Sequence, residues 1–249
     1  MHTEELRLNR RRFMYSLSAG AALLAVPAVY ADELVRTPRQ TEGPFYPTRL
    51  PLDTDNDLLV INDSLTPASG QPTLLSGRIL DSRGDPLRNV LVEIWQCDNN
   101  GVYLHPGSAN NGKRDPNFQG FGRFLTGMNG EYLFRTIKPV PYPGRTGHVH
   151  FAVKIKGEKT FTTQCYVKGE PLNDSDGVLK EIKDPKAKAS VIIPFTPLPG
   201  SRVGELNARF DIVLSDVTDG TGRLVVLPGA KGEEDVNQED GQQTDSCGP

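Results

Sequence analysis

From residue 73 onward the chain alternates apolar and polar residues in short stretches, separated by sequences rich in glycine, aspartate and serine. A period of two is typical of strands that bury one face, because successive side chains point to opposite sides. Turn sequences such as Asp-Ser-Arg-Gly at 81–84 and Gly-Glu-Lys at 157–159 end the stretches. The pattern predicts an all-β fold, a β-sandwich of mostly antiparallel strands with long loops. The expected strands cover residues 73–81, 89–97, 131–136, 147–156, 160–167, 190–195 and 208–214.

Two internal segments carry too little apolar sequence to contribute to a core. Residues 104–124 are rich in glycine and asparagine and are predicted to form a long loop. Loops of this length in compact domains are usually functional or disordered. Residues 173–188 form a polar insertion that is expected to hold one short helical turn.

The segments that flank the predicted sandwich domain at 73–227 differ from it in composition. Residues 32–72 are expected to form an extended arm, because Pro38, Gly43, Pro44 and Pro47 exclude a helix. Residues 228–249 are acidic and polar with almost nothing to bury, and we expect them to be disordered.

Residues 1–31 are typical of an export signal. Consecutive arginines at 10–12 precede an apolar run at 19–29, and the small residue Ala31 is a suitable cleavage point. The arginines before Phe13 resemble a twin-arginine signal. A membrane anchor is the alternative, but the run is shorter than the roughly 20 residues that a span needs. We therefore expect export to the periplasm or the exterior, without stable membrane insertion.

Charge and cysteine content narrow the function classes. The formal net charge is −3, and no basic stripe with interleaved aromatic residues follows the first dozen residues, so nucleic-acid binding is not expected. Cys97, Cys165 and Cys247 are too few and too irregularly spaced for a disulfide framework or a metal site. Cys97 and Cys165 are interpreted as small buried hydrophobic residues, and the sequence leaves the disulfide state of all three open.

The candidate chemistry begins with His148 and His150. If 147–156 is a strand, both imidazoles point to one face while Val149 and Phe151 point to the other. Adjacent imidazoles on one face can chelate a metal. The alternative is that they are two polar residues on the solvated face of a sheet.

Two tyrosines add to this pair. Tyr142 lies in a Pro-Tyr-Pro turn whose prolines fix the backbone, and Tyr103 follows an Asn-Asn-Gly turn. Phenolate is a hard anion, so two phenols with two imidazoles favour Fe(III) over Zn(II). The alternative is that Tyr103 and Tyr142 are ordinary half-buried tyrosines with hydrogen-bonded hydroxyls.

Taken together, these and further segments resemble the intradiol ring-cleavage dioxygenases, in particular the protocatechuate 3,4-dioxygenase-like and secreted members. The matching segments follow in the order expected for the family, from about residue 37 to about residue 214. They are Gln-Thr-Glu-Gly-Pro-Phe-Tyr-Pro at 40–47, Val-Glu-Ile-Trp-Gln at 92–96, Gly-Val-Tyr at 101–103, Asp-Pro-Asn-Phe at 115–118, Gly-Phe-Gly-Arg at 120–123, the stretch 130–139, Pro-Tyr-Pro at 141–143, and Arg145 with His-Val-His at 148–150.

The resemblance implies a non-haem Fe(III) site with Tyr103, Tyr142, His148 and His150 as ligands, of which Tyr142 leaves when substrate binds. It implies that Arg145 stabilises charge on the substrate ring and that Gln164 orients a bound phenolate oxygen. The implied activity is O2-dependent ring cleavage of catechol, protocatechuate or hydroxyquinol-like substrates to cis,cis-muconate-type products. It also places the segment that carries Tyr46 near the site, where this tyrosine either shapes the pocket or packs the arm down.

Some points stay open. The turn between Tyr142 and His148 is shorter than in protocatechuate-type enzymes and contains Gly144, so the resemblance does not select one catechol, and it leaves homo-oligomer formation undecided. A secreted β-sandwich that binds a ligand without catalysis is one alternative. A Zn(II) hydrolase built on His148 and His150 is another, although the sequence shows no suitably placed carboxylate ligand for it.

Overall fold

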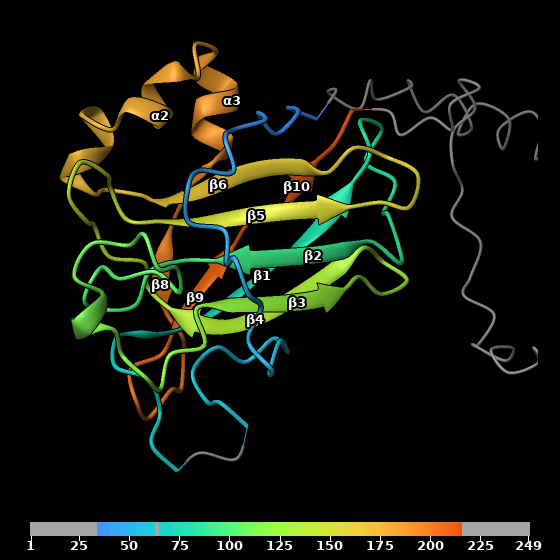
Figure 1. Ribbon diagram of the computed structural model, residues 1–249. Coiled ribbons are helices and arrows are strands. Elements are labelled where there is room, and N and C mark those ends of the chain that lie inside the picture. Colours follow the sequence, from blue (N-terminus) through green and yellow to red (C-terminus); the bar gives the residue numbers. More distant parts are fainter. Residues whose placement is uncertain (1–33, 63–64, 216–249) are drawn as a thin grey trace, which may run out of the picture. The chain divides into compact units, whose positions relative to one another are not determined.

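The computed structural model describes residues 34–62 and 65–215, which form two β-sheets with short helices at one edge (Figure 1). The expected signal segment 1–31, the expected tail 228–249 and Cys247 lie outside the described residues. Within the described part, no helix is both long enough and apolar enough to cross a membrane.

The first sheet is built around its longest strand, β1, which bonds to neighbours on both sides. Strand β4 pairs with it antiparallel, while β9 and β10 pair parallel to successive parts of it and β8 extends the sheet beyond β9. The strands are β1 (Pro72–Leu80), β4 (Glu131–Ile137), β8 (Phe195–Pro197), β9 (Leu206–Arg209) and β10 (Ile212–Val213).

The second sheet has the order β3-β2-β5-β6-β7, with antiparallel pairing except between β6 and β7. Strand β5 is therefore central, and its residues face neighbours on both sides in a fixed register. The strands are β2 (Leu91–Trp95), β3 (Phe121–Leu125), β5 (His148–Lys154), β6 (Phe161–Val167) and β7 (Ile192–Ile193).

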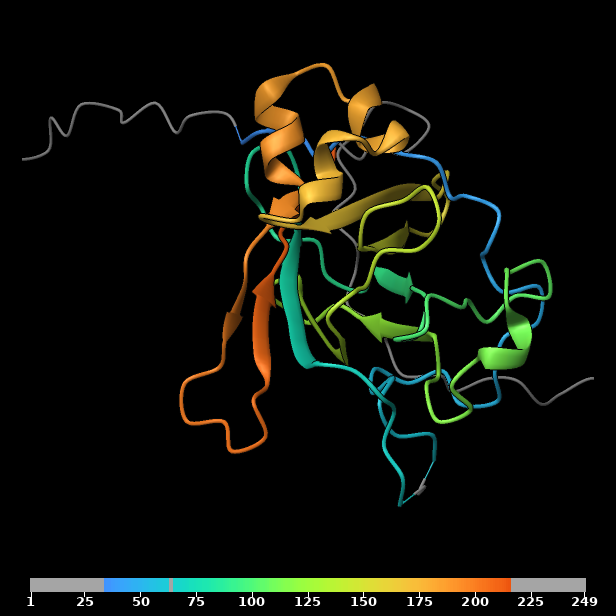
Figure 2. The same ribbon diagram turned by 90° about the vertical axis from the view of Figure 1, so that its left-hand side faces the viewer.

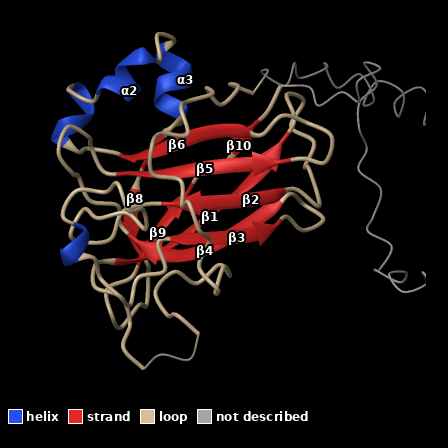
Figure 3. Cartoon of the chain, viewed as in Figure 1, coloured by secondary structure: helices blue, strands red, loops and turns tan. Residues whose placement is uncertain are grey.

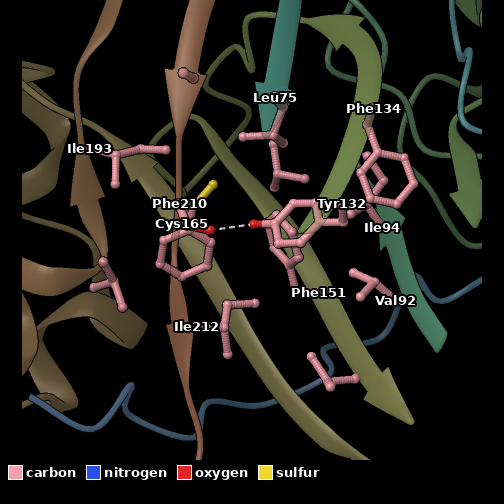
Figure 4. Packing of buried hydrophobic residues seen from close by; sticks show 14 of the residues in the cluster. Leu75, Val92, Ile94, Tyr132, Phe134, Phe151, Cys165, Ile193, Phe210 and Ile212 are labelled. Atoms are coloured by element: carbon pink, nitrogen blue, oxygen red, sulfur yellow. Dashed lines mark hydrogen bonds between the residues drawn. The ribbon is translucent and has the colours of Figure 1, made fainter. Parts of the chain in front are cut away.

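Apolar side chains from the facing sides of both sheets form one core (Figure 4). Val149, Phe151 and Val153 of β5 point into it, as strand alternation requires. The hydroxyl of Tyr132 donates a hydrogen bond to the carbonyl oxygen of Phe210, the residue that follows β9. This arrangement confirms the predicted all-β sandwich with mostly antiparallel strands.

The chain approaches itself most closely at Gly77. A Cβ atom on this glycine would lie 1.9 Å from the carbonyl oxygen of Phe210, where β9 gives way to β10. The amide of Phe210 donates to the Ser76 carbonyl oxygen at 2.8 Å, which holds the two backbones together. Only a residue without a side chain fits between them.

The arm crosses the outer face of the second sheet, where Figure 1 draws it in blue. Thr37 bonds to Val213 through both its amide and its hydroxyl, and Gln40 exchanges bonds with Thr162 of β6. Further along, Gly43 approaches His150 of β5. The face of β5 opposite the core is thus covered.

The short helices come mainly from one insertion between β6 and β7 (Figure 3). Its elements are the 3-10 helix η2 (Pro171–Asp174) and the helices α2 (Gly177–Glu181) and α3 (Pro185–Ser190), and a further 3-10 helix, η1 (Asn111–Lys113), lies elsewhere. Asp176 caps α2 by accepting from the amide of Leu179, and Asp184 caps α3 by accepting from that of Lys186. The prediction of one helical turn here was wrong, because two capping aspartates start two helices.

Three strand predictions need correction. Residues 121–125 form β3 although 104–124 was predicted as loop, because Gly122 marks a close approach rather than a turn: its Cβ would lie 2.6 Å from Leu58. The predicted strand 190–195 is two strands, separated by Pro194, which has no N–H to donate. The predicted strand 208–214 is divided between β9 and β10 at Phe210 and Asp211.

The two described cysteines agree with their interpretation as buried hydrophobic residues. Cys97 and Cys165 are both free and buried. Burial raises the pKa of each thiol to about 12, so neither presents a reactive thiolate at neutral pH.

Candidate metal centre

His148 and His150 lie on the covered face of β5 and are only 1% and 2% exposed. They are therefore not polar residues of a solvated sheet face. The ring Nδ1 of His148 lies 2.6 Å from the Thr146 carbonyl oxygen, which can only accept, so Nδ1 carries the hydrogen and Nε2 presents its lone pair. The Nε2 atoms of the two histidines face each other at 3.1 Å.

Tyr103 enters the same space from a tight turn after β2. The carboxylate of Asp98 accepts bonds from the amides of Asn100 and Val102, and Gly101 has a φ of 75°, which closes the turn. The Tyr103 ring is 1% exposed, and its hydroxyl lies 3.3 Å from Nε2 of His148.

Tyr142 is presented by a small hairpin. The backbones of Tyr142 and Arg145 bond to each other in both directions around Gly144, whose φ of 83° favours glycine. The Tyr142 ring packs edge-on to that of Tyr103 with centroids 5.4 Å apart. Tyr142 is half-buried, so it is the more accessible of the two phenols.

The spacing of three of these donors fits a metal ion, and the Tyr142 ring lies against those of Tyr103 and His148. Two ligands at about 2.1 Å from a metal and roughly at right angles lie about 3 Å apart, and the observed separations are 3.1 Å and 3.3 Å. Across the described ranges, no three His, Cys, Asp or Glu side chains form a group that could hold a metal. The Zn(II) hydrolase alternative therefore has no carboxylate to complete it, and any metal here would need the phenols.

Burial sets the protonation of the donors. It lowers the pKa of His148 to about 4, with help from the nearby charge of Arg145, and it lowers that of His150 further below its usual range. It also raises the pKa of Tyr103 well above 10 and that of Tyr142 to a smaller degree. Both imidazoles are thus neutral at pH 7, and both phenols need a strongly charged cation to ionise them.

Arg145 and Gln164 form a pair beside these donors. The Nη2 of Arg145 donates to the Gln164 amide oxygen at 2.7 Å, and the Gln164 amide nitrogen donates to the Thr41 carbonyl oxygen at 3.0 Å. Gln164 is fully buried and stands opposite His150 in the register of β5 and β6. It is therefore no surface glutamine, and its amide oxygen serves to anchor the arginine.

Three neighbours of the site were missed from sequence. Trp95 stacks on His150 with centroids 4.8 Å apart and planes 9° apart, Phe45 stacks on Tyr103 at 4.9 Å, and Asp176 bonds to Arg145 at 2.8 Å. Trp95 follows Glu93 by two positions, which puts it on the same face, and this alternation was the available signal. Asp176 precedes a glycine and looks like a turn residue.

Two further residues near the site have clear positions. The hydroxyl of Tyr46 donates to the buried carboxylate of Glu93 at 2.9 Å, and its ring packs edge-on against Trp95, so this tyrosine ties the arm to the sheet. His105 accepts a bond from the amide of Gly107 and lies near Phe45, outside the four-residue donor set.

Two buried imidazoles, one buried phenol and one half-buried phenol that lie together at the start of β5 form a donor set suited to a hard cation. Residues 41–216 match the family model described as dioxygenase. The chain belongs to the intradiol ring-cleavage dioxygenase family.

Individual relatives agree. The chain is 37% identical over 155 residues to the protocatechuate 3,4-dioxygenase beta chain of Burkholderia cepacia, covering 58% of this chain and 65% of that one. It is 30% identical over 196 residues to hydroxyquinol 1,2-dioxygenase of Corynebacterium glutamicum, covering 70% and 62%. The dioxygenase domain of a dioxygenase carbohydrate-binding fusion from Streptomyces sp. SirexAA-E is 31% identical, with a TM-score of 0.56 and coverage of 73% and 99%. The matches thus span 65% and 62% of the two curated relatives.

Proposed function

We propose that the protein is a non-haem Fe(III)-dependent intradiol dioxygenase that cleaves catechol-type substrates with O2 to cis,cis-muconate-type products. The observation that carries the proposal is that Nε2 of His148 lies within 3.3 Å of the donor atoms of both Tyr103 and His150, while the Tyr142 ring packs against the rings of Tyr103 and His148. The names of the relatives, which act on protocatechuate and hydroxyquinol, support a catecholic substrate. Export through a twin-arginine signal belongs to the proposal and rests on the sequence of residues 1–31.

The four converging residues would hold the iron, which supplies the Lewis acidity that lets a catechol ionise. Residues of the chain itself orient the ligands, take up a proton and exclude water. The Thr146 carbonyl keeps the proton on Nδ1 of His148 and so keeps Nε2 free. Tyr142 is the more accessible phenol, so its oxygen is placed to take up a proton from the incoming catechol. Phe45 and the arm cover Tyr103 and His150 and exclude water from them.

Arg145 supplies a fixed positive charge at this point. Its guanidinium stays protonated at any relevant pH, and its charge lowers the pKa of the Tyr142 phenol against the larger, opposite effect of burial. Negative charge that develops on the substrate ring would be stabilised by this preorganised cation.

The test is a visible absorption spectrum of the purified, iron-loaded protein, before and after anaerobic addition of catechol, protocatechuate or hydroxyquinol. A tyrosinate-to-Fe(III) charge-transfer band that shifts with substrate, followed by O2 uptake and muconate formation in air, is the expected result. A protein that stays colourless after iron reconstitution would contradict the proposal and favour the non-catalytic binding module.

Arg145→Ala is expected to keep the iron and its colour but to lower kcat by about 100-fold or more, a loss comparable to that of an oxyanion-hole donor. Iron content and steady-state O2 uptake check this, with Arg202→Ala as a matched control. Arg202 is an exposed arginine on the loop between β8 and β9. Unchanged turnover in Arg145→Ala would reject the assigned role.

A further inference from the structure

The insertion between β6 and β7 contacts residues beside the candidate metal centre. Viewed from the end where β5 begins, α2 and α3 lie beside β6 (Figure 2). Two polar side chains of the insertion, Asn173 and Asp176, are buried. Buried polar groups need partners, and both find them at the start of β5.

Every bond that the structure gives the Asp176 carboxylate is well formed. Oδ1 accepts from the amide of Leu179 at 2.9 Å, which caps α2. Oδ2 accepts from Nε of Arg145 at 2.8 Å and from the amide of Thr146 at 3.0 Å. The side chain is fully buried, whereas that of Arg145 is 17% exposed. A buried carboxylate requires a counter-charge, and Arg145 provides it.

The bond to Asp176 fixes the guanidinium from one side, and Gln164 fixes it from another. Nε is bound to Asp176, while Nη2 is bound to the Gln164 amide oxygen at 2.7 Å. Two anchors at different nitrogens define the plane of a guanidinium, since the group is rigid. The backbone of Arg145 is bonded in both directions to that of Tyr142, so the anchored guanidinium belongs to the same hairpin as this phenol.

A separate contact, between Asn173 and Thr146, supports the orientation of His148. The hydroxyl of Thr146 donates to the side-chain oxygen of Asn173 at 2.9 Å, and the Thr146 carbonyl receives Nδ1–H of His148. Loss of the Asp176 bond to Thr146 therefore leaves Thr146 tethered by Asn173. The arrangement separates the orientation of Arg145 from the retention of the metal ligand His148.

We propose that Asp176 is a positioning residue, which holds the Arg145 guanidinium in the orientation needed for turnover and makes the helical insertion part of the catalytic machinery. This inference rests on the proposed dioxygenase function. It assigns a role to a residue that lies outside the motifs of the family resemblance.

The chain offers a sharp substitution and a matched control. Asn is as good an N-cap as Asp, so Asp176→Asn keeps the bond to Leu179 and the helix. Its amide group cannot also accept from Arg145 and Thr146, because an NH2 group meets N–H donors there. Asp184→Asn makes the same change at the cap of α3, where the carboxylate is exposed and bonds to the amide of Lys186.

The experiment is a double-mutant cycle of Asp176→Asn and Arg145→Ala in the iron-loaded protein, with Asp184→Asn alongside. Iron content, the charge-transfer band, kcat and KM are measured for each variant. In the metal-free protein, the Nε–H resonance of Arg145 is followed by NMR and assigned by its absence in Arg145→Ala. Asp176→Glu, which keeps the charge, is the fourth variant and replaces Asp176→Asn in the cycle if the latter does not fold.

We expect Asp176→Asn to keep its iron and colour while kcat falls about 10- to 100-fold, as for other misplaced catalytic groups. On the Arg145→Ala background the same change should cost nothing further, because it acts through the arginine. Asp176→Glu should recover part of the lost turnover. The Arg145 resonance should move in Asp176→Asn and stay in place in Asp184→Asn, which should also keep wild-type turnover.

A loss of kcat that adds in full to that of Arg145→Ala would overturn the inference. So would wild-type kcat in a folded Asp176→Asn protein, or an equal loss in Asp184→Asn. Absence of O2 uptake by the wild-type protein with every catechol tested would instead refute the proposed function. In that case the NMR comparison still decides whether Asp176 holds Arg145.

Discussion

Replacing His150 with alanine is expected to yield a folded protein that no longer retains iron and has no detectable dioxygenase turnover. Removing a residue that only hydrogen-bonds to a metal ligand weakens metal binding about 10- to 100-fold. Removing the ligand itself should therefore weaken metal binding more. The ring is stacked on Trp95 in a covered site, so no neighbouring side chain or bulk water can replace it at the same point.

The fold should survive this change. Truncating a buried ring costs about 2–5 kcal/mol through the cavity it leaves, and a domain has about 5–15 kcal/mol of stability. Iron per protein and the visible band provide the measurement, with circular dichroism to verify folding. His105→Ala is the control and should keep both iron and colour. Tyr103→Phe, which removes one hydroxyl without a cavity, should weaken the band as well. Normal iron content in His150→Ala would refute the assigned ligand set.

Gly77→Ala is expected to destabilise the protein by at least about 3 kcal/mol, the upper end of what overpacking usually costs. The new methyl group would meet the Phe210 carbonyl oxygen at 1.9 Å and its carbonyl carbon at 2.7 Å. Both are backbone atoms, so no rotamer change relieves the clash, and β1 must separate from the β9–β10 junction. A domain holds only about 5–15 kcal/mol of stability in total, so this loss is large.

Urea unfolding followed by tryptophan fluorescence measures the effect, since Trp95 is buried in the second sheet. Gly112→Ala is the matched control, because no atom lies within 4 Å of its added Cβ, and it should change stability by less than about 0.5 kcal/mol. An unfolding midpoint of Gly77→Ala equal to that of the wild type would show that the two backbones can part at little cost.

Sequence patterns located most of the strands, but they did not show which strand faces are buried by other segments of the chain. Alternation at 148–151 placed both histidines on one face correctly, because the side-chain period of a strand is fixed. It could not show that this face is buried, since the cover comes from Gly43 and its neighbours, far away in the sequence. Gly122 of β3 contributed to the glycine content from which a loop was predicted, although it makes room for Leu58.

The candidate site was predictable only in part, for a similar reason. Tyr103 and Tyr142 were selected by resemblance, because nothing in their local sequence shows that two turns point at the same strand. Asp176 gave no signal at all. A capping aspartate before a glycine resembles any loop aspartate until the bond to Arg145 is seen, and that bond depends on how the insertion docks.

The bonds of the arm also set the order in which the site is completed. Thr37 is anchored to Val213 and Gln40 to β6, so contacts near the start of the described chain wait for partners more than a hundred residues later. Such long-range closure is slow, because loop entropy must be overcome before the contact forms. The bond between Thr37 and Val213 can form only after residue 213 has been synthesised, so the arm is fully anchored only when almost all of the described chain is present.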